Sequence, residues 1–369
     1  MKSQATSLTK IALRKFRKNI WGVFSFVFLT IAVLVAIFAY ALAPDNSRNA
    51  NQMHLSVHSK SPGFKVTMLT IPAEVEKQNG LAVFFFGRQN ANTEIPISEY
   101  KVTDNGIEIM EYTSEGAEGL RKEYEVSQFP NVAAPEDIPK QYISEKKFLL
   151  GTDKYGRDLL SRMLIGIRIS LAIGFVAVFI SLLIGITLGA VAGYFGGKVD
   201  AAIMWLINVT WSIPTLLLVI AITLALGKGF WQVFIAVGLT MWVEVARVVR
   251  GQVMSVKQMQ YVTAARALGF KDWRIITRHI LPNSMAPVII ISAANFASAI
   301  LIESGLSFLG IGAQPPMPSW GGIIKDHYAY IILGKPYLAI IPGIAIMSLV
   351  TAFMLMGNAL RDALDVKSS

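Results

Sequence analysis

An acidic residue within an apolar segment is the first feature of this sequence that could do chemistry. Glu303 lies near the end of a long apolar run, and a carboxylate in such a helix marks either a functional site or a paired structural site. Near a helix end, water or a donor from a loop can reach the carboxylate. We therefore predict that Glu303 is a structural acid that anchors the adjoining loop, with direct contact to a substrate as the alternative.

Two histidines, His54 and His58, have the i, i+4 spacing of a metal-binding pair on a helix. Their neighbours Val57 and Pro62 favour extended chain over helix, so we interpret both as solvated surface histidines. The sequence contains no cysteine, which excludes disulfides, thiolate metal sites and thiol nucleophiles. We predict no catalytic residue and no metal site.

A proline in the middle of another apolar segment, Pro214, follows a short polar run. Proline removes a backbone donor and bends a helix. A bent helix lined with polar residues is a candidate for a translocation path, although small and hydroxyl side chains also hold helices together. The candidate path residues are Asn208, Thr210, Trp211 and Ser212.

Charged residues and glycines elsewhere offer two further patterns. Glu244 and Arg247 are three positions apart and can pair along one helix face. Residues 193–198 and 227–228 superficially resemble phosphate-binding loops, but neither has a glycine, four residues and then Gly-Lys-Ser/Thr. We therefore predict that this chain binds no ATP and holds no cofactor.

The composition indicates a polytopic membrane protein. Of 369 residues, 53% are hydrophobic and only 16% are charged, which is too apolar for an ordinary soluble enzyme. A helix needs roughly 20 residues to cross a hydrocarbon core of about 30 Å. Segments long and apolar enough lie at residues 21–42, 169–192, 201–226, 231–249, 286–309 and 337–359.

The distribution of Lys and Arg predicts the orientation of these spans. Basic residues gather in residues 2–18 and 250–278, whereas the opposite short loops hold few. Because such residues accumulate on the cytoplasmic side, we predict both termini inside and an uncleaved first span, despite an Ala-Leu-Ala sequence at residues 41–43. The net charge of +10 reflects this bias, and no basic face with interleaved aromatics predicts a nucleic-acid partner.

Residues 44–150 differ from the rest, because they are polar and rich in proline. They are long enough to fold as an extracytoplasmic insert. Residues 65–71 and 81–86 are rich in strand formers, and residues 100–110 alternate around Asn105-Gly106, a strong hairpin signal. We expect loop with one short helix over residues 116–147.

The stretch QYVTAARALGFKDWRIITRHILPN, residues 260–283, is a basic insertion between two spans. Residues 259–268 favour a helix, and Gly269 stands where a left-handed C-terminal residue belongs. Asp272 can cap a second helix that Pro282 ends. We expect its apolar residues on one face: Trp273, Ile276 and Ile280.

The small side chains of the first of these helices would let another protein approach the backbone closely, with cations at the edge. The small residues are Ala264, Ala265 and Ala267, and the cations are Arg266, Lys271, Arg274 and Arg278. The alternative is an amphipathic helix that lies on the lipid surface.

The run AARALG, nine residues and HILPN resembles the ATPase-coupling motif of ABC importer permeases: Glu-Ala-Ala, three residues, Gly, nine residues, Ile, any residue and Leu-Pro. Two positions depart from it, since Thr263 replaces the acidic residue and His279 replaces the isoleucine. The resemblance assigns ATPase contact to Thr263, Ala264, Ala265, Arg266, Ala267, Leu268, Gly269, Leu281 and Pro282.

Two further segments resemble the dipeptide and oligopeptide branch of these permeases. GTDKYGRDLLSR, residues 151–162, is similar to the segment that opens the core of that branch. ESGLSFLG, followed by GAQPP and PSWG within residues 303–321, resembles the outer end of its fifth span and the next loop. The three matches occur in order and cover most of residues 150–365, but not the insert.

The resemblance implies an all-α polytopic membrane protein with six transmembrane helices of the ABC type-1 importer permease fold, and an inserted extracytoplasmic β-rich domain between spans 1 and 2. The expected parts are a basic tail with the first span (1–43), the insert (44–150), an interfacial segment (151–168), the core with spans 2–6 (169–360) including the coupling loop (250–285), and a cytoplasmic tail (361–369).

The resemblance also implies a function and partners. The chain would be a non-enzymatic permease subunit that imports di- or oligopeptides across the inner membrane of a prokaryote. Its partners would be the lipid bilayer, a homologous second permease, two ABC ATPase subunits that hold ATP and Mg, and an extracytoplasmic substrate-binding protein. An ion-coupled secondary transporter and a membrane-anchored binding or assembly module remain the alternatives.

Overall fold

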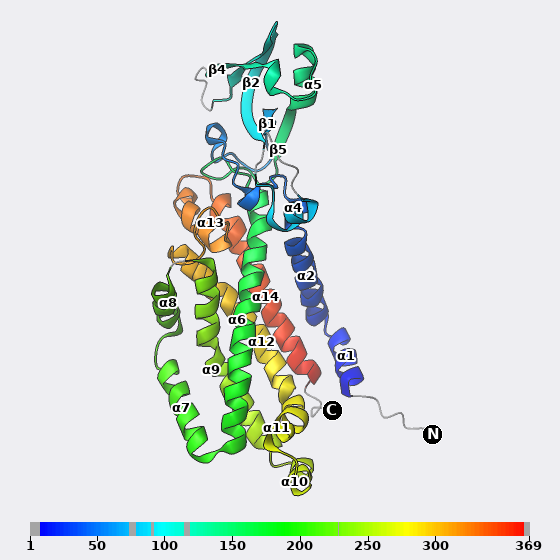
Figure 1. The fold of residues 1–369 in the computed structure, drawn as a ribbon, viewed down its shortest axis with the longest axis vertical. Helices are drawn as coiled ribbons and strands as arrows, with labels where there is room; N and C mark the ends of the chain where they lie inside the picture. Colours follow the sequence, from blue (N-terminus) through cyan, green and yellow to red (C-terminus); the bar gives the residue numbers. More distant parts are fainter. Residues whose placement is uncertain (1–7, 74–78, 90–91, 114–118, 228, 365–369) are drawn as a thin grey trace, which may run out of the picture. The chain divides into compact units, whose positions relative to one another are not determined.

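The computed structural model describes residues 8–73, 79–89, 92–113, 119–227 and 229–364 (Figure 1). Within them the chain forms two compact units. The first unit takes residues up to 33, 170–314 and from 344 onward; the second takes residues 34–169 and 315–343. Lys2 of the basic N-terminal tail and most of the predicted tail 361–369 lie outside the described residues.

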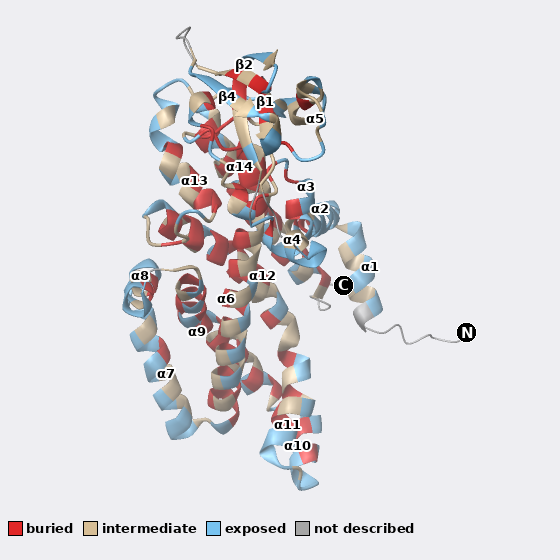
Figure 2. Ribbon diagram, turned by 45° about the horizontal axis from the view of Figure 1, so that its top comes forward, coloured by how far each residue is buried: buried red, intermediate tan, exposed pale blue. Residues whose placement is uncertain are grey.

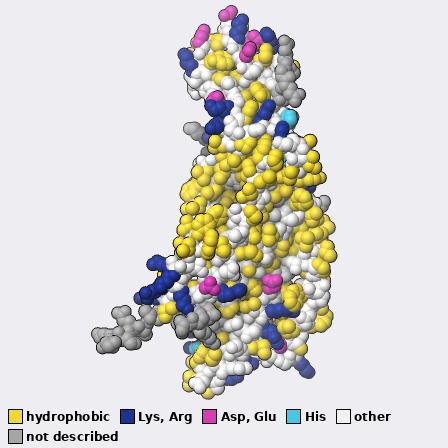
Figure 3. Space-filling model, turned by 180° about the vertical axis from the view of Figure 1, so that it is seen from behind, with side chains coloured by type: hydrophobic (Ala, Val, Ile, Leu, Met, Phe, Trp, Pro, Cys, Tyr) yellow, Lys and Arg dark blue, Asp and Glu magenta, His cyan; other side chains and the backbone are white. Residues whose placement is uncertain are grey.

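Long apolar helices dominate the structure. Its helices are α1 (Leu8–Lys18), α2 (Ile20–Ile37), α3 (Ala39–Leu42), α4 (Gly80–Phe86), α5 (Ile138–Tyr142), α6 (Leu159–Phe195), α7 (Gly197–Trp211), α8 (Thr215–Leu226), α9 (Phe230–Val256), α10 (Gln260–Ala267), α11 (Asp272–Ile275), α12 (Leu281–Phe308), α13 (Trp320–His327) and α14 (Tyr337–Leu364). Among the described residues, five helical segments could each cross a membrane, or six if the bent pair α7 and α8 counts as one. Hydrophobic side chains cover much of the helical surface in Figure 3.

The bend predicted at Pro214 is confirmed. The axes of α7 and α8 differ by 90°, and Pro214 occupies the position before the first turn of α8. Helix α6 begins at Leu159 and continues without a break to Phe195. The predicted interfacial segment 151–168 therefore holds the first turns of this long helix instead of a separate element.

Close contact between α6 and α9 forms the centre of the first unit. α9 is the most buried of the long apolar helices described (Figure 2). Three glycines spaced four apart on α6 face it: Gly185, Gly189 and Gly193. A Cβ atom on Gly189 would lie 2.5 Å from the carbonyl oxygen of Ala246. Small residues at this spacing let membrane helices approach closely, which sequence reasoning missed here.

Gly189→Ala is expected to destabilise the protein by about 1–3 kcal/mol, because the added methyl group would push against the backbone of α9. Gly251→Ala is the matched control, since a Cβ at Gly251 in α9 would meet nothing within 4 Å. We expect the control to be neutral or stabilising by up to about 1 kcal/mol. Thermal unfolding of both variants in detergent measures the difference, and equal midpoints would contradict this packing.

A five-stranded antiparallel sheet lies within residues 64–148 of the second unit, in the order β4-β3-β2-β1-β5. Its strands are β1 (Phe64–Ile71), β2 (Thr93–Thr103), β3 (Gly106–Glu111), β4 (Arg121–Glu125) and β5 (Ile143–Phe148). The predicted first strand and the hairpin around Asn105-Gly106 are confirmed, with Thr103 opposite Gly106. Leu69, Ile97, Ile107, Ile109, Phe129 and Ile138 form its main core.

Two predictions for this region were wrong. Residues 81–86 form helix α4, where the Asn79 side chain accepts a hydrogen bond from the Leu81 N–H and so caps the helix. Short apolar runs do not separate helix from strand by periodicity alone. Residues 116–147, predicted as loop with one short helix, contain that helix as α5 but also strand β4 and most of β5; residues 116–118 lie outside the described residues.

Candidate functional site

The predicted coupling region folds as a helix, a turn and a second helical segment (Figure 1). Gly269 has a φ of 75°, which confirms the left-handed residue after α10. Pro282 does not end the second segment: α11 continues through a π-helix, Ile276–Ile280, into α12. Proline is tolerated there because the π-helix already interrupts the i→i−4 hydrogen-bond ladder, and the Leu281 N–H bonds to the Ile276 carbonyl instead.

Asp272 does not act as the predicted helix cap. Lys271 occupies the N-cap position without a side-chain hydrogen bond, and Asp272 accepts a hydrogen bond of 2.5 Å from the Tyr194 hydroxyl at the end of α6. The Lys257 ammonium after α9 donates to the Tyr194 backbone carbonyl, and the Arg266 guanidinium lies 5.6 Å from the Tyr194 ring. One tyrosine thus joins the coupling region to α6 and α9.

The inner face of the coupling region is apolar and belongs to the core of its own chain. It packs against Val249, Val253 and Val256 of α9 through Val262, Ala265, Ile275, Ile276 and Ile280. Ala265 is only 4% exposed, so its side chain is not offered to a partner. Trp273 lies only about 60° around the helix from Ile276, but it does not share the buried face, because its side chain is exposed whereas Ile276 and Ile280 are buried.

The outer face carries two large exposed apolar side chains. Leu268 is 73% exposed and Trp273 is 72% exposed. Around them lie the exposed predicted contact residues Thr263, Ala264, Arg266, Ala267, Gly269 and Pro282, with half-buried Leu281, and the exposed cations Lys271, Arg274 and Arg278. Exposed Leu and Trp side chains within one small region are characteristic of an interaction surface.

A cavity of about 300 Å³ opens at the break between α7 and α8. It is lined by Thr210, Trp211, Ile213, Thr215, Leu218, Thr240, Met241, Val243, Glu244, Ser298, Leu301 and Ile302. Of the four candidate path residues, Thr210 and Trp211 therefore face the cavity. The other two make hydrogen bonds instead. The Ser212 hydroxyl donates to the backbone carbonyl of Asn208, and the Asn208 side chain accepts from Arg247 of α9.

Arg247 does not make the predicted contact with Glu244. Its guanidinium donates to the Asn208 side-chain oxygen at 3.1 Å and lies 3.4 Å above the Trp211 ring. Glu244 instead lines the cavity and is exposed. The cavity is therefore lined by one carboxylate, from Glu244, and by Trp211, on whose ring the Arg247 guanidinium stacks.

Glu303 is fully buried near the end of α12. Its carboxylate accepts a hydrogen bond of 2.6 Å from Ser307, whose hydroxyl accepts in turn from the Ala313 N–H. The loop passes so close that a Cβ at Gly312 would lie 2.2 Å from the Ser307 hydroxyl oxygen. These contacts fit the loop-anchoring role expected for Glu303.

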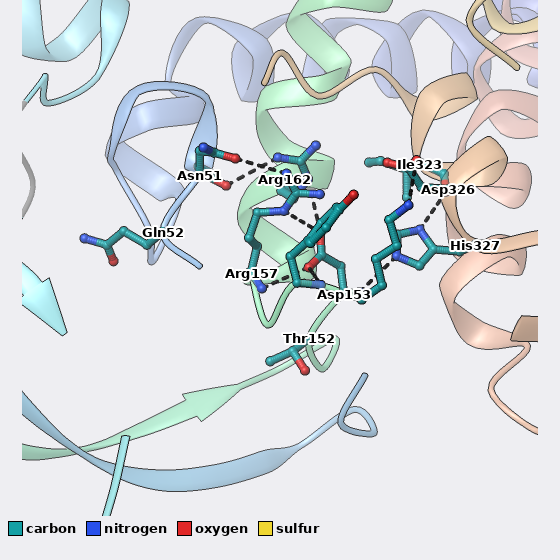
Figure 4. Close-up of polar contacts among 12 residues, drawn as sticks. Asn51, Gln52, Thr152, Asp153, Arg157, Arg162, Ile323, Asp326 and His327 are labelled. Atoms are coloured by element: carbon teal, nitrogen blue, oxygen red, sulfur yellow. Dashed lines mark hydrogen bonds and ion pairs between the residues drawn. The ribbon is translucent and has the colours of Figure 1, made fainter. Parts of the chain in front are cut away.

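Sequence reasoning missed a buried ionic cluster around Asp153 in the second unit (Figure 4). The Asp153 carboxylate is fully buried; it accepts a hydrogen bond of 2.6 Å from the Arg157 side chain and lies 3.7 Å from Arg162 Nε. Arg157 also donates to the Asn51 side chain, and Arg162 to the carbonyls of Asn49 and Ala50. The Asp-x₃-Arg spacing was the signal available in the sequence.

The same cluster extends to α13, which carries Asp326 and His327 (Figure 4). The backbone N–H of Lys154 donates to His327 Nε2 at 3.1 Å, and its ammonium pairs with Asp326 at 3.0 Å. His327 Nδ1 lies 2.7 Å from the Ile323 carbonyl. One ring nitrogen must therefore donate and the other accept, which requires a neutral imidazole.

His54 corrects the prediction of a surface histidine. It is 7% exposed and lies 3.7 Å from Glu94, which also pairs with Lys146. Burial lowers the pKa of the His54 imidazole, and the nearby Lys146 lowers it further. His58 is exposed, as predicted.

The second unit should lose stability as the pH falls. Burial is the main cause that lowers the pKa of His327, supported by Lys154 and opposed by the Ile323 carbonyl, Asp153 and Asp326. Below about pH 6.5 the unfolded chain binds protons that the folded chain excludes, so stability decreases from there toward the lower folded pKa. We expect a lower unfolding midpoint at about pH 5.5 than at about pH 7.5, and a smaller difference for His327→Gln. Equal midpoints would contradict the neutral imidazole.

Comparisons with known proteins decide the family. Residues 185–366 match the family described as binding-protein-dependent transport system inner membrane component, and residues 7–61 match the N-terminal TM domain of oligopeptide transport permease C. The chain is 43% identical over 218 residues to the glutathione transport system permease protein GsiD of Pectobacterium atrosepticum, covering 59% of this chain and 72% of the relative. The chain belongs to the permeases of binding-protein-dependent ABC importers.

A second relative is the dipeptide transport system permease protein DppC of Bacillus subtilis, which is 39% identical to the permease over 240 residues; the match covers 63% of the permease and 75% of DppC. Among solved structures, an inward-facing MetNI methionine ABC transporter is similar with a TM-score of 0.46 and 18% identity, covering 55% of the permease and 95% of that chain. The five-stranded sheet lies between the two regions that match family descriptions.

Proposed function

We propose that the permease forms half of the translocation path of an importer for di- or oligopeptides, which separate ATPase subunits drive. The outer face of the coupling region carries this proposal, because Leu268 and Trp273 expose apolar surface beside four cations. The names of the relatives, which are dipeptide and glutathione permeases, support a peptide substrate.

The proposed assembly has this permease, a homologous second permease, two ATPase subunits that hold ATP and Mg, and an extracytoplasmic substrate-binding protein. This chain would hold no cofactor and perform no hydrolysis. We place it in the inner membrane of a prokaryote with both termini in the cytoplasm, six spans of the type-1 importer fold, and the sheet-containing insert outside.

The contacts of Tyr194 support a route for motion from the ATPases to the spans. This residue ends α6 and contacts Asp272, Lys257 and Arg266. A displacement of the coupling region would therefore move the ends of α6 and α9 together. The cavity between α7, α8, α9 and α12 would change its access as these helices move, because closed and open ATPases favour different packings.

Affinity purification of the tagged permease in mild detergent tests the proposed assembly. Mass spectrometry should identify a homologous permease and ABC ATPase subunits with the wild-type chain. A permease that is isolated alone, in a detergent that keeps a known ABC importer intact, would contradict the proposal and favour a secondary transporter or an anchored module.

A further inference from the structure

Helix α4 exposes a group of large apolar side chains. Its sequence is GLAVFFF, and no residue in it is fully buried. Leu81 is 69% exposed, Phe86 is 67% exposed and Phe85 is 47% exposed. Contiguous apolar surface of this kind marks an interaction site for a protein or a membrane.

The helix is held against α3, which follows the C-terminal end of α2 (Figure 1). The Phe84 ring meets the Phe38 ring edge to face at 5.6 Å. Gly87 follows α4 with a φ of 76°, and a Cβ there would lie 2.6 Å from the Tyr40 ring. The position of α4 is therefore fixed relative to the end of this span.

A third contact comes from α6. Arg168 donates a hydrogen bond of 2.8 Å to the Phe85 carbonyl, and its guanidinium lies 5.0 Å from the Tyr40 ring. The carbonyl at the end of α4 is thereby satisfied by a side chain. These contacts fix the backbone of α4, while the side chains of Leu81, Phe85 and Phe86 stay exposed.

The exposed surface of α4 continues the surface of α2 that would face lipid. α2 is long and apolar enough to cross a membrane. At its C-terminal end Leu34 and Ile37 are 48% and 44% exposed, and Phe38, the residue that follows α2, is 45% exposed. Because the Phe38 and Phe84 rings are in contact, apolar side chains at the end of the span adjoin those of α4. This continuity favours a bilayer over a protein as the occupant.

We propose that α4 lies in the headgroup region of the leaflet next to the C-terminal end of α2 and inserts Leu81, Phe85 and Phe86 among the acyl chains. The polar residues that flank it, Asn79 and Arg88, are exposed and fit the headgroup region. The segment that carries the sheet would thus be anchored to the membrane surface at α4 as well as by its two adjoining spans.

The absence of cysteine allows a direct test by single-cysteine spin labelling. The variants Leu81→Cys and Phe86→Cys carry a nitroxide in the full chain, assembled with its partners in phosphatidylcholine and phosphatidylglycerol vesicles. Electron paramagnetic resonance then measures collisions with oxygen, which concentrates in lipid, and with a water-soluble nickel chelate. Phe24→Cys on α2 is the lipid reference, and Leu120→Cys, at a residue 67% exposed beside β4, is the water control.

At both α4 positions we expect the ratio of oxygen to nickel collisions to exceed that at Leu120→Cys several-fold and to approach that at Phe24→Cys. Ratios equal to the Leu120→Cys control would place α4 in water and overturn the proposal. Exclusion of both reagents would show that protein covers α4, which would also overturn it. Both results are independent of transport, so failure of the proposed function would not be mistaken for failure of this proposal.

Discussion

Leu268→Asp is expected to abolish ATP-driven uptake while leaving the permease folded. Leu268 follows α10 and is 73% exposed. It does not belong to the buried apolar cluster that packs the coupling region against α9. If an ATPase covers this side chain, a carboxylate there costs about 2–4 kcal/mol of binding energy, as at a central residue of an interface. That loss corresponds to about 30- to 700-fold in affinity.

The measurement is the amount of ATPase that purifies with the tagged variant, together with uptake by reconstituted vesicles. Trp273→Asp should have the same effect from the neighbouring helix, and Leu120→Asp is the control at another exposed leucine. If Leu268→Asp and Trp273→Asp both purified with as much ATPase as the wild type, the outer face of the coupling region would not be the site that binds the ATPase. Ala265→Glu is a poorer probe, because burial of that residue confounds docking with folding.

Asp153→Ala is expected to destabilise the permease by about 3–5 kcal/mol, because it leaves two buried guanidinium groups without their carboxylate. Arg157 and Arg162 are 3% and 5% exposed, so water cannot replace the lost partner. The variant also removes the acceptor of the Tyr155 and Arg157 backbone N–H groups. We expect a large fall in the thermal midpoint or no recovery of folded protein.

The matched control for Asp153→Ala is Glu145→Ala. Glu145 pairs with Lys65 at 2.8 Å, but their side chains are 59% and 53% exposed. Exposed pairs of this kind contribute about 0–1 kcal/mol. If Asp153→Ala unfolded at the same temperature as Glu145→Ala, the Asp153 cluster would not stabilise the second unit.

The sequence predicted correctly those structural features that depend only on residues close together in the chain. Apolar runs of sufficient length marked the spans, Pro214 marked the bend, and Asn105-Gly106 marked the hairpin. Gly269 marked the end of α10 because a left-handed residue follows that helix. These features depend on neighbouring residues only, so a single sequence contains them.

Features made by distant contacts were missed. The strands β4 and β5 are rich in charge and lack clear alternation, and they form strands because they pair with β3 and β1. The Asp153 cluster joins residues near position 50 with the start of α6 and with α13. Only the folded chain shows that Ala265 faces inward, since its burial depends on the valines of α9.

Uptake by the reconstituted wild-type importer tests the central claim most directly. Vesicles that hold the permease, its co-purified subunits and the binding protein should accumulate a labelled dipeptide when ATP is supplied on the ATPase side, and a nonhydrolysable analogue should not support accumulation. Uptake that proceeds without ATP and follows an imposed proton or sodium gradient would contradict an ATP-driven permease and identify a secondary transporter.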